Sequence, residues 1–541
     1  MSSITAPKYS IVDLFAGAGG LSCGFLQTEK FEIKAAYENN IHARTTYNLN
    51  HPDTEVYEDV CSADYKKLSE KFGHINVVMG GPPCQGFSNA NRQKNHAISK
   101  NNALVKQFIR AVVDLEPDAF VMENVSMLKS DIHQFFVDAG DLEKIINYKI
   151  PTKATEIVLL EADFVFKDAQ AIIKDKKQIQ KYIWAEADYL ALNIVYKMRN
   201  NEDKQKKALI KYKNNLLRLS KHLLESDAEA YIMKQNHKAA NALIQYFNTD
   251  NIMNSNEIEP AIMIQRMLGK AKELYDNNIV INHFSSNGDL IAHVAAMAVL
   301  DYITCILKGH NYTLDLDVLR AAEFGVPQKR ERFVIIGVKK SICSDIKLPV
   351  GKLKPMQYVT VKEAIEDISD LQVEYDVEAD KGIALDQAPI SISELGRKLR
   401  NNTILYNHIA TRSTETALNR FSNLKQGENF HDLDKALKTT YSDPKRTQNT
   451  IYLRLKYDEP SGTVVNIRKS MWIHPIHNRA LSIREAARLQ TFPDTFIFCG
   501  TKDAQYQQIG NAVPPMLAQS IAEKIADALE SGKKNSISEA I

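Results

Sequence analysis

Residues 80 to 88 read GGPPCQGFS and follow directly after the mainly apolar run 75 to 79. A short run of this kind is typical of a buried parallel strand, and the glycines and prolines end it in a sharp, stiff turn. Open α/β sheets bind their ligands at the carboxyl ends of their strands. The pattern therefore predicts such a sheet, with Cys84 presented at the edge that carries the chemistry. A lone cysteine can also be a small buried hydrophobe, so the thiol needs support from other motifs.

The N-terminal segment predicts a strand, a glycine turn and a helix. The strand SIVDLF (10 to 15) leads into AGAGGL, and the apolar periodicity of Leu21, Phe25 and Leu26 continues as a helix. The glycines let the backbone approach a ligand closely. A second strand, 32 to 37, ends in Glu38, whose carboxylate can bind ribose hydroxyls, and Asp59 follows a third strand as a candidate for an adenine edge. This pattern alone would also suit NAD or FAD, although its G-A-G-G spacing departs from G-x-G-x-x-G.

Two later segments supply further polar side chains, and the first brings a carboxyl group to the same edge of the sheet as the thiol. A helix over 103 to 115 precedes the strand 119 to 122, which delivers Glu123 at its carboxyl end. Further on, Arg330 and Arg332 precede another apolar strand, and in extended chain alternate residues point the same way. Taken alone, Glu123 could be an ordinary acidic residue on the surface, and Arg330 and Arg332 could be surface arginines in contact with solvent.

Length and composition limit the class of protein. A chain of 541 residues, 44% hydrophobic and 25% charged, predicts two or three domains. We expect a cytoplasmic protein, because no apolar stretch reaches the roughly 18 to 20 residues of a membrane span and no signal peptide is recognisable. The six scattered cysteines contain no CxxC pair, which argues against a zinc site and against disulfides. A net charge of +2 neither demands nor excludes nucleic acid.

Six motifs occur in one order along the chain, and together they resemble the DNA cytosine carbon-5 methyltransferases. They are DLFAGAGGLSCGF (13–25), GGPPCQGFS (80–88), MENV (122–125), QKRERF (328–333), REAARLQTFPD (484–494) and QIGNAVPP (508–515). The resemblance is clear over 1–135, 285–345 and 480–530.

The resemblance implies a fold and a division into domains. The fold class is α/β, with a doubly wound, mostly parallel, Rossmann-like sheet, a smaller target-recognition domain and an inserted α-helical domain. The catalytic domain would comprise 1–138 and 285–345, completed by 480–541, and the target-recognition domain would be 346–479. The insertion would be 139–284, because the chain has no glycine and no proline between Pro151 and Pro260 and is rich in helix-forming residues.

The resemblance also implies the chemistry. The chain would transfer a methyl group from S-adenosyl-L-methionine to carbon 5 of a cytosine in a specific double-stranded DNA sequence, after flipping the base out of the stack. Cys84 would add to carbon 6, Glu123 would contact ring nitrogen 3 and the exocyclic amine, and Arg332, supported by Arg330, would hold the carbonyl oxygen. No metal is implied. The implied cofactor-binding residues are Phe15, Gly17, Gly19, Leu21, Glu38, Asp59, Val60, Pro83, Leu104, Asn511 and Val513.

Partners follow from the same resemblance. The expected partner is double-stranded DNA, bound by a monomer associated with the nucleoid; a cognate restriction endonuclease, for a restriction–modification system, is left open. Strand-like runs such as GTVVNI and a set of basic and aromatic residues suggest DNA contact in 346–479: Lys445, Arg446, Tyr452, Arg454, Arg468 and Trp472. The lysine-rich part of the insertion could touch phosphates or form a solvated helix face.

Two alternatives use the same motifs. A tRNA cytosine-5 methyltransferase would share the cysteine and the cofactor motifs, but that branch resembles PPCQPFT where this chain has PPCQGFS. A catalytically silent DNA-binding regulatory module would usually have lost the nucleophile, the acid or the arginine, and all three are present here.

Overall fold

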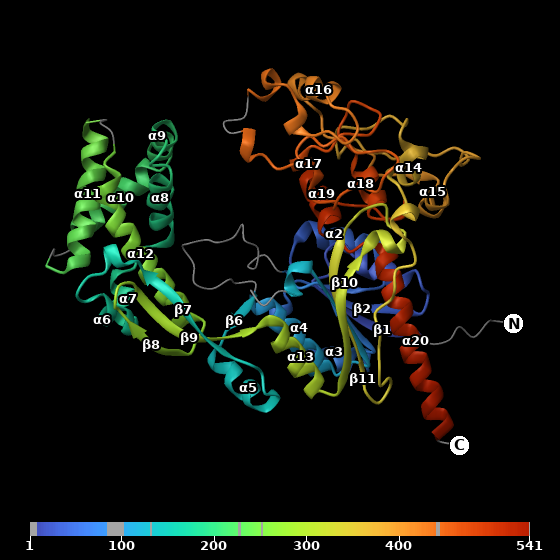
Figure 1. Cartoon of the computed structure of the whole chain (residues 1–541), viewed down its shortest axis with the longest axis horizontal. Coiled ribbons are helices and arrows are strands. Elements are labelled where there is room, and N and C mark those ends of the chain that lie inside the picture. Colours follow the sequence, from blue (N-terminus) through green and yellow to red (C-terminus); the bar gives the residue numbers. More distant parts are fainter. Residues whose placement is uncertain are drawn as a thin grey trace. The chain divides into compact units, whose positions relative to one another are not determined.

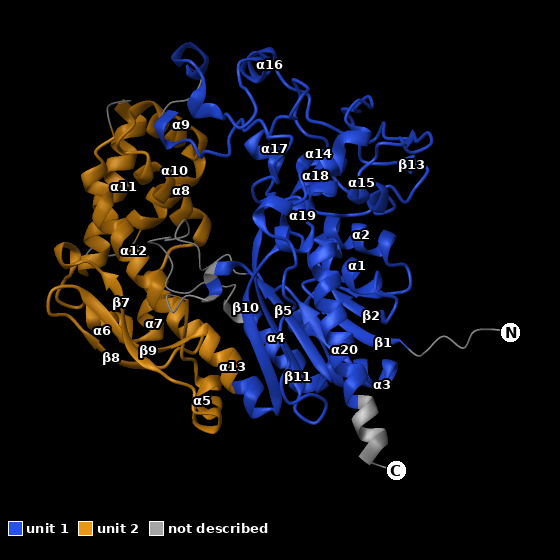
Figure 2. Ribbon diagram, turned by 45° about the vertical axis from the view of Figure 1, so that its right-hand side comes forward, with its two compact units in different colours: residues 1–84, 103–129, 306–541 blue, residues 85–102, 130–305 orange. Residues whose placement is uncertain are grey.

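A computed structural model describes residues 8–83, 102–129, 133–225, 229–249, 253–439 and 444–539. The chain forms two compact units, coloured separately in Figure 2. Unit 1 comprises residues 1–84, 103–129 and 306–541, and unit 2 comprises 85–102 and 130–305. The target-recognition segment expected from the sequence, 346–479, lies in unit 1. Most of the expected catalytic segment lies there too, but its parts 85–102, 130–138 and 285–305 belong to unit 2.

The described part of unit 1 is built on a seven-stranded sheet in the order β10-β11-β5-β4-β1-β2-β3. Strands β1 to β5 are parallel to one another, whereas β11 is antiparallel to both β5 and β10. The mostly parallel α/β sheet predicted from the sequence is confirmed. The strands are β1 (Tyr9–Leu14), β2 (Phe31–Tyr37), β3 (Glu55–Tyr57), β4 (Val77–Gly80), β5 (Ala119–Asn124), β10 (Tyr312–Arg320) and β11 (Glu331–Lys339).

Helices from both ends of the chain cover this sheet (Figure 1). They are α1 (Gly20–Leu26), α2 (Ile41–Asn50), α3 (Tyr65–Phe72), α4 (Asn102–Leu115) and the C-terminal α20 (Pro515–Glu539). Helix α1 packs on α20 so closely that a Cβ on Gly24 would lie 2.4 Å from the Cβ of Ala518. Leu517 and Ile521 of α20 join the same core cluster as Ile11 of β1. The end of the chain thus completes the layer that its first helix begins.

The rest of unit 1 is made of short helices and long connections. They are α14 (Val361–Ile365), α15 (Glu394–Leu399), α16 (Glu415–Ser422), α17 (Ile467–Ser470), α18 (Ile483–Leu489) and α19 (Lys502–Asn511), with the small strands β12 (Ile383–Ala384) and β13 (Ile404–Leu405). The strand expected at GTVVNI is wrong, because 463–466 is irregular and α17 begins at Ile467. The Val464 backbone pairs instead with two side chains: its N–H donates to Gln328 and its carbonyl accepts from Arg330.

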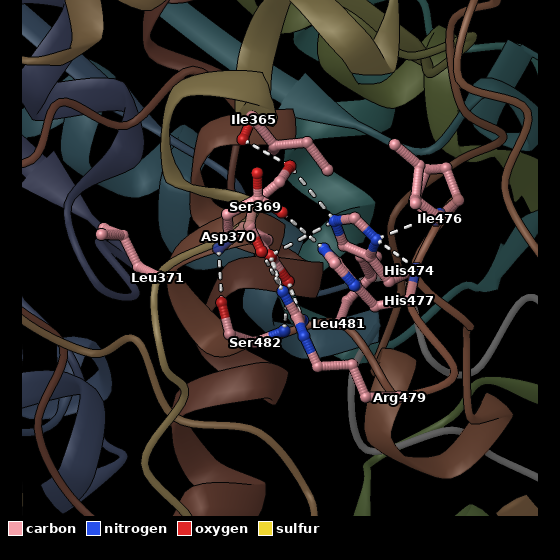
Figure 3. Close-up of polar contacts among 12 residues, drawn as sticks. Ile365, Ser369, Asp370, Leu371, His474, Ile476, His477, Arg479, Leu481 and Ser482 are labelled. Atoms are coloured by element: carbon pink, nitrogen blue, oxygen red, sulfur yellow. Dashed lines mark hydrogen bonds and ion pairs between the residues drawn. The ribbon is translucent and has the colours of Figure 1, made fainter. Parts of the chain in front are cut away.

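A buried polar network fixes α18, the helix that carries the REAARLQ motif (Figure 3). Glu485 is fully buried and accepts two hydrogen bonds from Arg479, at 2.6 and 2.8 Å, and one from the Ser482 N–H at 2.7 Å. The Nε2 atom of His474 lies 3.6 Å from the same carboxylate. Despite burial, these partners hold the pKa of Glu485 at about 2. The carboxylate therefore serves the fold and stays ionised within it.

Unit 2 combines a sheet with a bundle of helices. Its strands are β6 (Gln134–Phe136), β7 (Lys153–Leu160), β8 (Ile281–Ser285) and β9 (Leu290–Ala298), with β9 pairing with each of the other three. Its helices are α5 (Leu142–Tyr148), α6 (Ala169–Lys174), α7 (Lys176–Tyr182), α8 (Glu186–Lys197), α9 (Glu202–Lys211), α10 (Lys213–Leu224), α11 (Tyr231–Thr249) and α12 (Ser255–Asp276), while α13 (Val299–Gly309) spans the boundary with unit 1.

The inserted segment is mainly helical, as expected, but it also contains strands. In β7 the side chains of Ile157 and Leu159 are buried while Glu156 and Val158 are exposed. This alternation suits a strand in a sheet with one covered face. The strand was not predicted, because the segment around it is rich in helix-forming residues. Among the described residues, none of the helices has the length and apolar character needed to cross a membrane.

Candidate active site

Glu123 and Arg332 form an ion pair at the carboxyl end of β5. In the antiparallel pairing of β5 with β11, Glu123 faces Val334, so Arg332, two residues before Val334, points to the same face of the sheet. The Glu123 Oε1 and Arg332 Nε atoms are 2.5 Å apart, and each side chain is 12% exposed. Burial raises the pKa of Glu123 above its ordinary value, although the guanidinium opposes this effect. Glu123 and Arg332, both among the catalytic candidates implied by the resemblance, therefore lie together at one edge of the sheet.

The chain that follows β4 passes directly beside this pair. A Cβ on Gly81 would lie 2.8 Å from the Glu123 Oε2 atom, and one on Gly80 would lie 2.2 Å from the Leu14 carbonyl oxygen. Only glycine fits at these two positions without a shift. The side-chain amide of Asn124 donates to the Pro82 carbonyl at 2.9 Å. The turn that leads to the thiol is therefore held against the carboxylate, while Cys84 itself lies outside the described residues.

Arg330 points away from this edge into the interior. It is fully buried, and its two Nη atoms donate to the carbonyls of Val464 at 2.8 Å and Gly510 at 3.0 Å. Gln328, also fully buried, donates to the Leu489 carbonyl at 2.9 Å and to the Gln490 side chain at 2.6 Å. Of the two arginines predicted for the site, only Arg332 contacts Glu123. Arg330 ties together segments that are far apart in the sequence.

The glycine turn after β1 is joined to the end of β2 by Glu38. The Glu38 carboxylate accepts from the Gly17 N–H at 2.8 Å and from the Asn40 N–H at 2.7 Å. Gly17 has a φ of 57°, and a Cβ built on it would meet no atom within 4 Å. Phe15 also has a φ of 57°, which is uncommon for a bulky side chain and is a form of strain often found at functional sites. The turn thus offers open space beside an oriented carboxylate.

A buried polar chain lies beneath the turn, and sequence reasoning missed it. Asp13 is 1% exposed and accepts from the Ser22 hydroxyl at 2.6 Å, and the Ser22 Oγ is 2.7 Å from the Tyr47 hydroxyl. Burial raises the pKa of Asp13 to about 7. The ring of His51 packs on Tyr47, and burial lowers its pKa to about 4. The acidic residue inside the buried strand SIVDLF was the available signal.

The other predicted cofactor residues differ in how far they are buried and in what they contact. Val60 is buried and Asp59 caps the short turn that contains it, accepting from the Cys61 N–H at 2.9 Å. Pro83 and Leu104 are half-buried, and Val513 is buried. The side chain of Leu21 packs in the core, so only its backbone can face a ligand. Asn511 is exposed, and its amide oxygen accepts from Gln507 of the same helix.

Two glycines of the turn, Gly19 and Gly20, pack closely against His51 and Val513. A Cβ on Gly19 would lie 2.4 Å from the Nε2 atom of His51, and one on Gly20 would lie 2.5 Å from the Val513 carbonyl oxygen. The QIGNAVPP segment, which the resemblance places near the cofactor, reaches the glycine turn through the backbone of Val513.

Three of the residues expected to contact DNA are buried instead. Trp472 and Tyr452 are 1% and 3% exposed, and Arg454 is 5% exposed. The Arg454 guanidinium donates to the carbonyls of Leu424, Phe421 and His474. Because these donors are already used inside the fold, the expectation of DNA contact is wrong for these three residues. Lys445, Arg446 and Arg468 are exposed, and the Arg468 guanidinium lies 3.4 Å from the Asp503 carboxylate.

Comparison with known proteins identifies a matching family and several similar proteins. A family model described as C-5 cytosine-specific DNA methylase matches residues 9–153 and 288–527. The type II methyltransferase M.DdeI of Desulfomicrobium norvegicum is 26% identical over 96% of this chain and 88% of its own length. The type II methyltransferase M1.HphI of Haemophilus parahaemolyticus is 25% identical over 95% and 86%. The DNA (cytosine-5-)-methyltransferase M.ApeKI of Aeropyrum pernix is 25% identical over 97% and 99%.

A solved structure shares the fold. The crystal structure of an E. coli prophage protein assigned as a DNA modification methyltransferase superposes with a TM-score of 0.53, at 20% identity, over 97% of this chain and all of the other. The gap in the family match, 154–287, falls within unit 2. The residues that surround the Glu123–Arg332 pair, in contrast, all lie inside the matched segments.

Proposed function

The chain belongs to the C-5 cytosine-specific DNA methylases and is a DNA (cytosine-5-)-methyltransferase, and from this premise we propose that it methylates cytosine in a specific double-stranded DNA sequence through a covalent adduct with Cys84. The observation that carries the proposal is the buried pair of Glu123 and Arg332, with Gly81 packed against the carboxylate. Cys84 follows Gly81 by three residues, so a base held by the pair would lie within reach of its thiol.

The reaction needs a nucleophile and a partner for the charge that it creates. Addition of the Cys84 thiolate to carbon 6 forms a carbon–sulfur bond and makes carbon 5 electron-rich. Glu123, whose pKa is raised by burial, supplies a proton to ring nitrogen 3 as the electrons move into the ring. The Arg332 guanidinium holds the carbonyl oxygen and orients Glu123. After the methyl group is transferred, loss of the carbon-5 proton allows the thiolate to leave.

The methyl group comes from S-adenosyl-L-methionine, the methyl donor of this family, which presents it on a positively charged sulfonium. The turn fits such a ligand, because the space above Gly17 is open and each Glu38 oxygen accepts a single backbone N–H. We assign Glu38 to the ribose hydroxyls, and Asp59 and Val60 to the adenine. Phe15, Gly17, Gly19, Pro83, Leu104, Asn511 and Val513 complete the assigned set, with Leu21 through its backbone.

The target base must leave the duplex to reach the pair, since both side chains are largely buried. Base flipping costs a few kcal/mol of unstacking, which contacts with the protein offset. Residues 346–479 are assigned to target recognition, and 139–284 to an inserted domain with strands at its start and end. The type II relatives support a role in restriction–modification, with a cognate endonuclease that cleaves the same sequence; as an orphan methylase the chain would act without one.

Mapping of methylated cytosines tests this function directly. DNA from cells that express the chain, treated with bisulfite and sequenced, should show methylcytosine at one recurring sequence and nowhere else. A purified reaction with labelled S-adenosyl-L-methionine should label duplex DNA and leave tRNA unlabelled. Labelled tRNA with unlabelled DNA would overturn the proposal, and methylation at scattered sites would overturn its sequence specificity.

A further inference from the structure

Helix α11 of unit 2 has an exposed face without a negative charge. Its 19 residues, YIMKQNHKAANALIQYFNT, include no aspartate and no glutamate. One side of the helix is buried against neighbouring helices, and the other side exposes a stripe at helical spacing. The stripe contains Lys234, Lys238, Asn241 and Gln245, which we call the α11 stripe. Two cations and two side-chain amides therefore project from one face.

The α11 stripe is not used by the fold. In the part of the chain that the structure describes, the side chains of these four residues have no hydrogen bond and no ion pair. Arg218 of the neighbouring α10, in contrast, is paired with Asp188 at 2.6 Å. Figure 1 shows α11 beside α10 in the helical part of unit 2. The stripe is thus available to an external partner.

A groove runs along the same face. Its volume is about 380 Å³, and its lining contains Lys238, Asn241 and Gln245 of the stripe, together with Ala242, Tyr246, Thr249, Asn254 and Glu257. Hydrogen-bonding groups dominate this lining. Glu257, the single carboxylate among the lining residues, belongs to the first turn of α12. The groove suits a polar ligand that offers both acceptors and donors.

We propose that the α11 stripe binds duplex DNA, with Lys234 and Lys238 on phosphates and Asn241 and Gln245 on hydrogen-bonding groups of the sugars and bases. Lysine without a carboxylate neighbour on its helix complements a polyanion, and asparagine and glutamine are suited to base edges. From Lys234 to Gln245 the helix rises about 16 Å, close to five base pairs of duplex. The inference deepens the proposed function, because it gives the insertion a role on the same substrate.

Paired alanine variants of the full chain test the inference. K234A/K238A removes both cations and keeps a good helix former at each position. Binding of the duplex found methylated in cells, and of an unrelated duplex, would be followed by fluorescence anisotropy over a salt series. Loss of two phosphate contacts should weaken both complexes on the order of 10- to 30-fold at 0.15 M salt, and should reduce the slope of log K against log salt by about 2.

A matched control lies on the same unit. K174A/K177A removes two exposed lysines from α6 and α7, outside the stripe, and should leave the affinity and the slope unchanged. N241A/Q245A should weaken binding without changing the slope, because no charge is removed. If K234A/K238A binds DNA as the control variant does, the inference is wrong. Unchanged DNA affinity in N241A/Q245A would show that the side-chain amides of Asn241 and Gln245 do not contact DNA.

Methyl transfer separates this inference from the proposed function. At saturating DNA, all three variants should transfer the methyl group at the wild-type rate, because the stripe is not part of the catalytic site. Normal transfer together with unchanged DNA affinity in K234A/K238A would overturn only the role of α11. Failure of the wild-type chain to methylate DNA would overturn the proposed function itself.

Discussion

The carboxylate of Glu123 and the guanidinium of Arg332 lie 2.5 Å apart, although unit 2 separates them in the chain. The antiparallel register of β5 and β11 produces this contact by placing both side chains on one face of the sheet. A carboxylate and a guanidinium that are both largely buried stabilise each other, because either side chain alone would be a buried charge without a counter-ion. The pair is thereby preorganised for a substrate that brings its own polar groups.

Replacement of Glu123 by glutamine should slow methyl transfer by about 10²- to 10⁴-fold, because the amide cannot supply a proton. Single-turnover transfer measures this rate, and titration with S-adenosyl-L-methionine should show nearly unchanged affinity. Glu331→Gln is the matched control, since Glu331 is exposed at the start of the strand that carries Arg332. A large loss of cofactor affinity with normal turnover would show that Glu123 belongs to the cofactor site and not to the catalytic site.

Replacement of Cys84 by serine should abolish methyl transfer while cofactor binding persists, since a hydroxyl is far less ionised than a thiol. DNA with 5-fluorocytosine at the target should form a denaturation-resistant complex with the wild type and none with Cys84→Ser, because fluorine does not leave as a proton does. Cys343→Ser, at a half-buried thiol, should still be trapped. A serine variant that transfers methyl groups would exclude the covalent mechanism.

Replacement of Arg330 by methionine should destabilise the protein. The change leaves the carbonyls of Val464 and Gly510 buried without these donors, at about 1 to 3 kcal/mol each. Urea unfolding should show a loss of about 2 to 6 kcal/mol. Arg320→Met, which removes an exposed ion pair with Glu331, should cost less than about 1 kcal/mol. Unchanged stability with lost activity in the Arg330 variant would return this residue to the catalytic set.

Replacement of Asp13 by asparagine should change how stability depends on pH. Folding raises the pKa of Asp13 from 3.8 to about 7, so the stability that the protonated form contributes is full below pH 3.8 and is lost as the pH rises through 7. Asparagine does not ionise, so the variant should match the wild type near pH 4 and exceed it at pH 8.5 by about 4 kcal/mol at most.

Thermal unfolding at several pH values measures this difference. Asp53→Asn, at an exposed position, should show no such trend. A difference between the Asp13 variant and the wild type that is the same at pH 4 and pH 8.5 would show that folding does not shift the pKa of Asp13.

The sequence by itself determined the strands of the sheet, the turns that follow them and the family of the enzyme. Short apolar runs, glycine turns and motif strings are local features, and β1, β2, β4, β5 and β11 lie where these features predicted them. Periodicity and composition were sufficient for these points. That Glu123 and Arg332 share a site was implied only by the resemblance, because the sequence does not show that β11 runs antiparallel to β5.

Only the tertiary structure decided which way the remaining side chains face. Arg330 and Arg332 are equivalent in the sequence, yet one binds carbonyls in the interior and the other binds Glu123, because Val464 and Gly510 are brought beside only the first. Trp472 and Arg454 looked suited to DNA and are buried for the same kind of reason. Burial and hydrogen-bond partners depend on segments that are distant in the chain, and neither residue type nor local spacing specifies them.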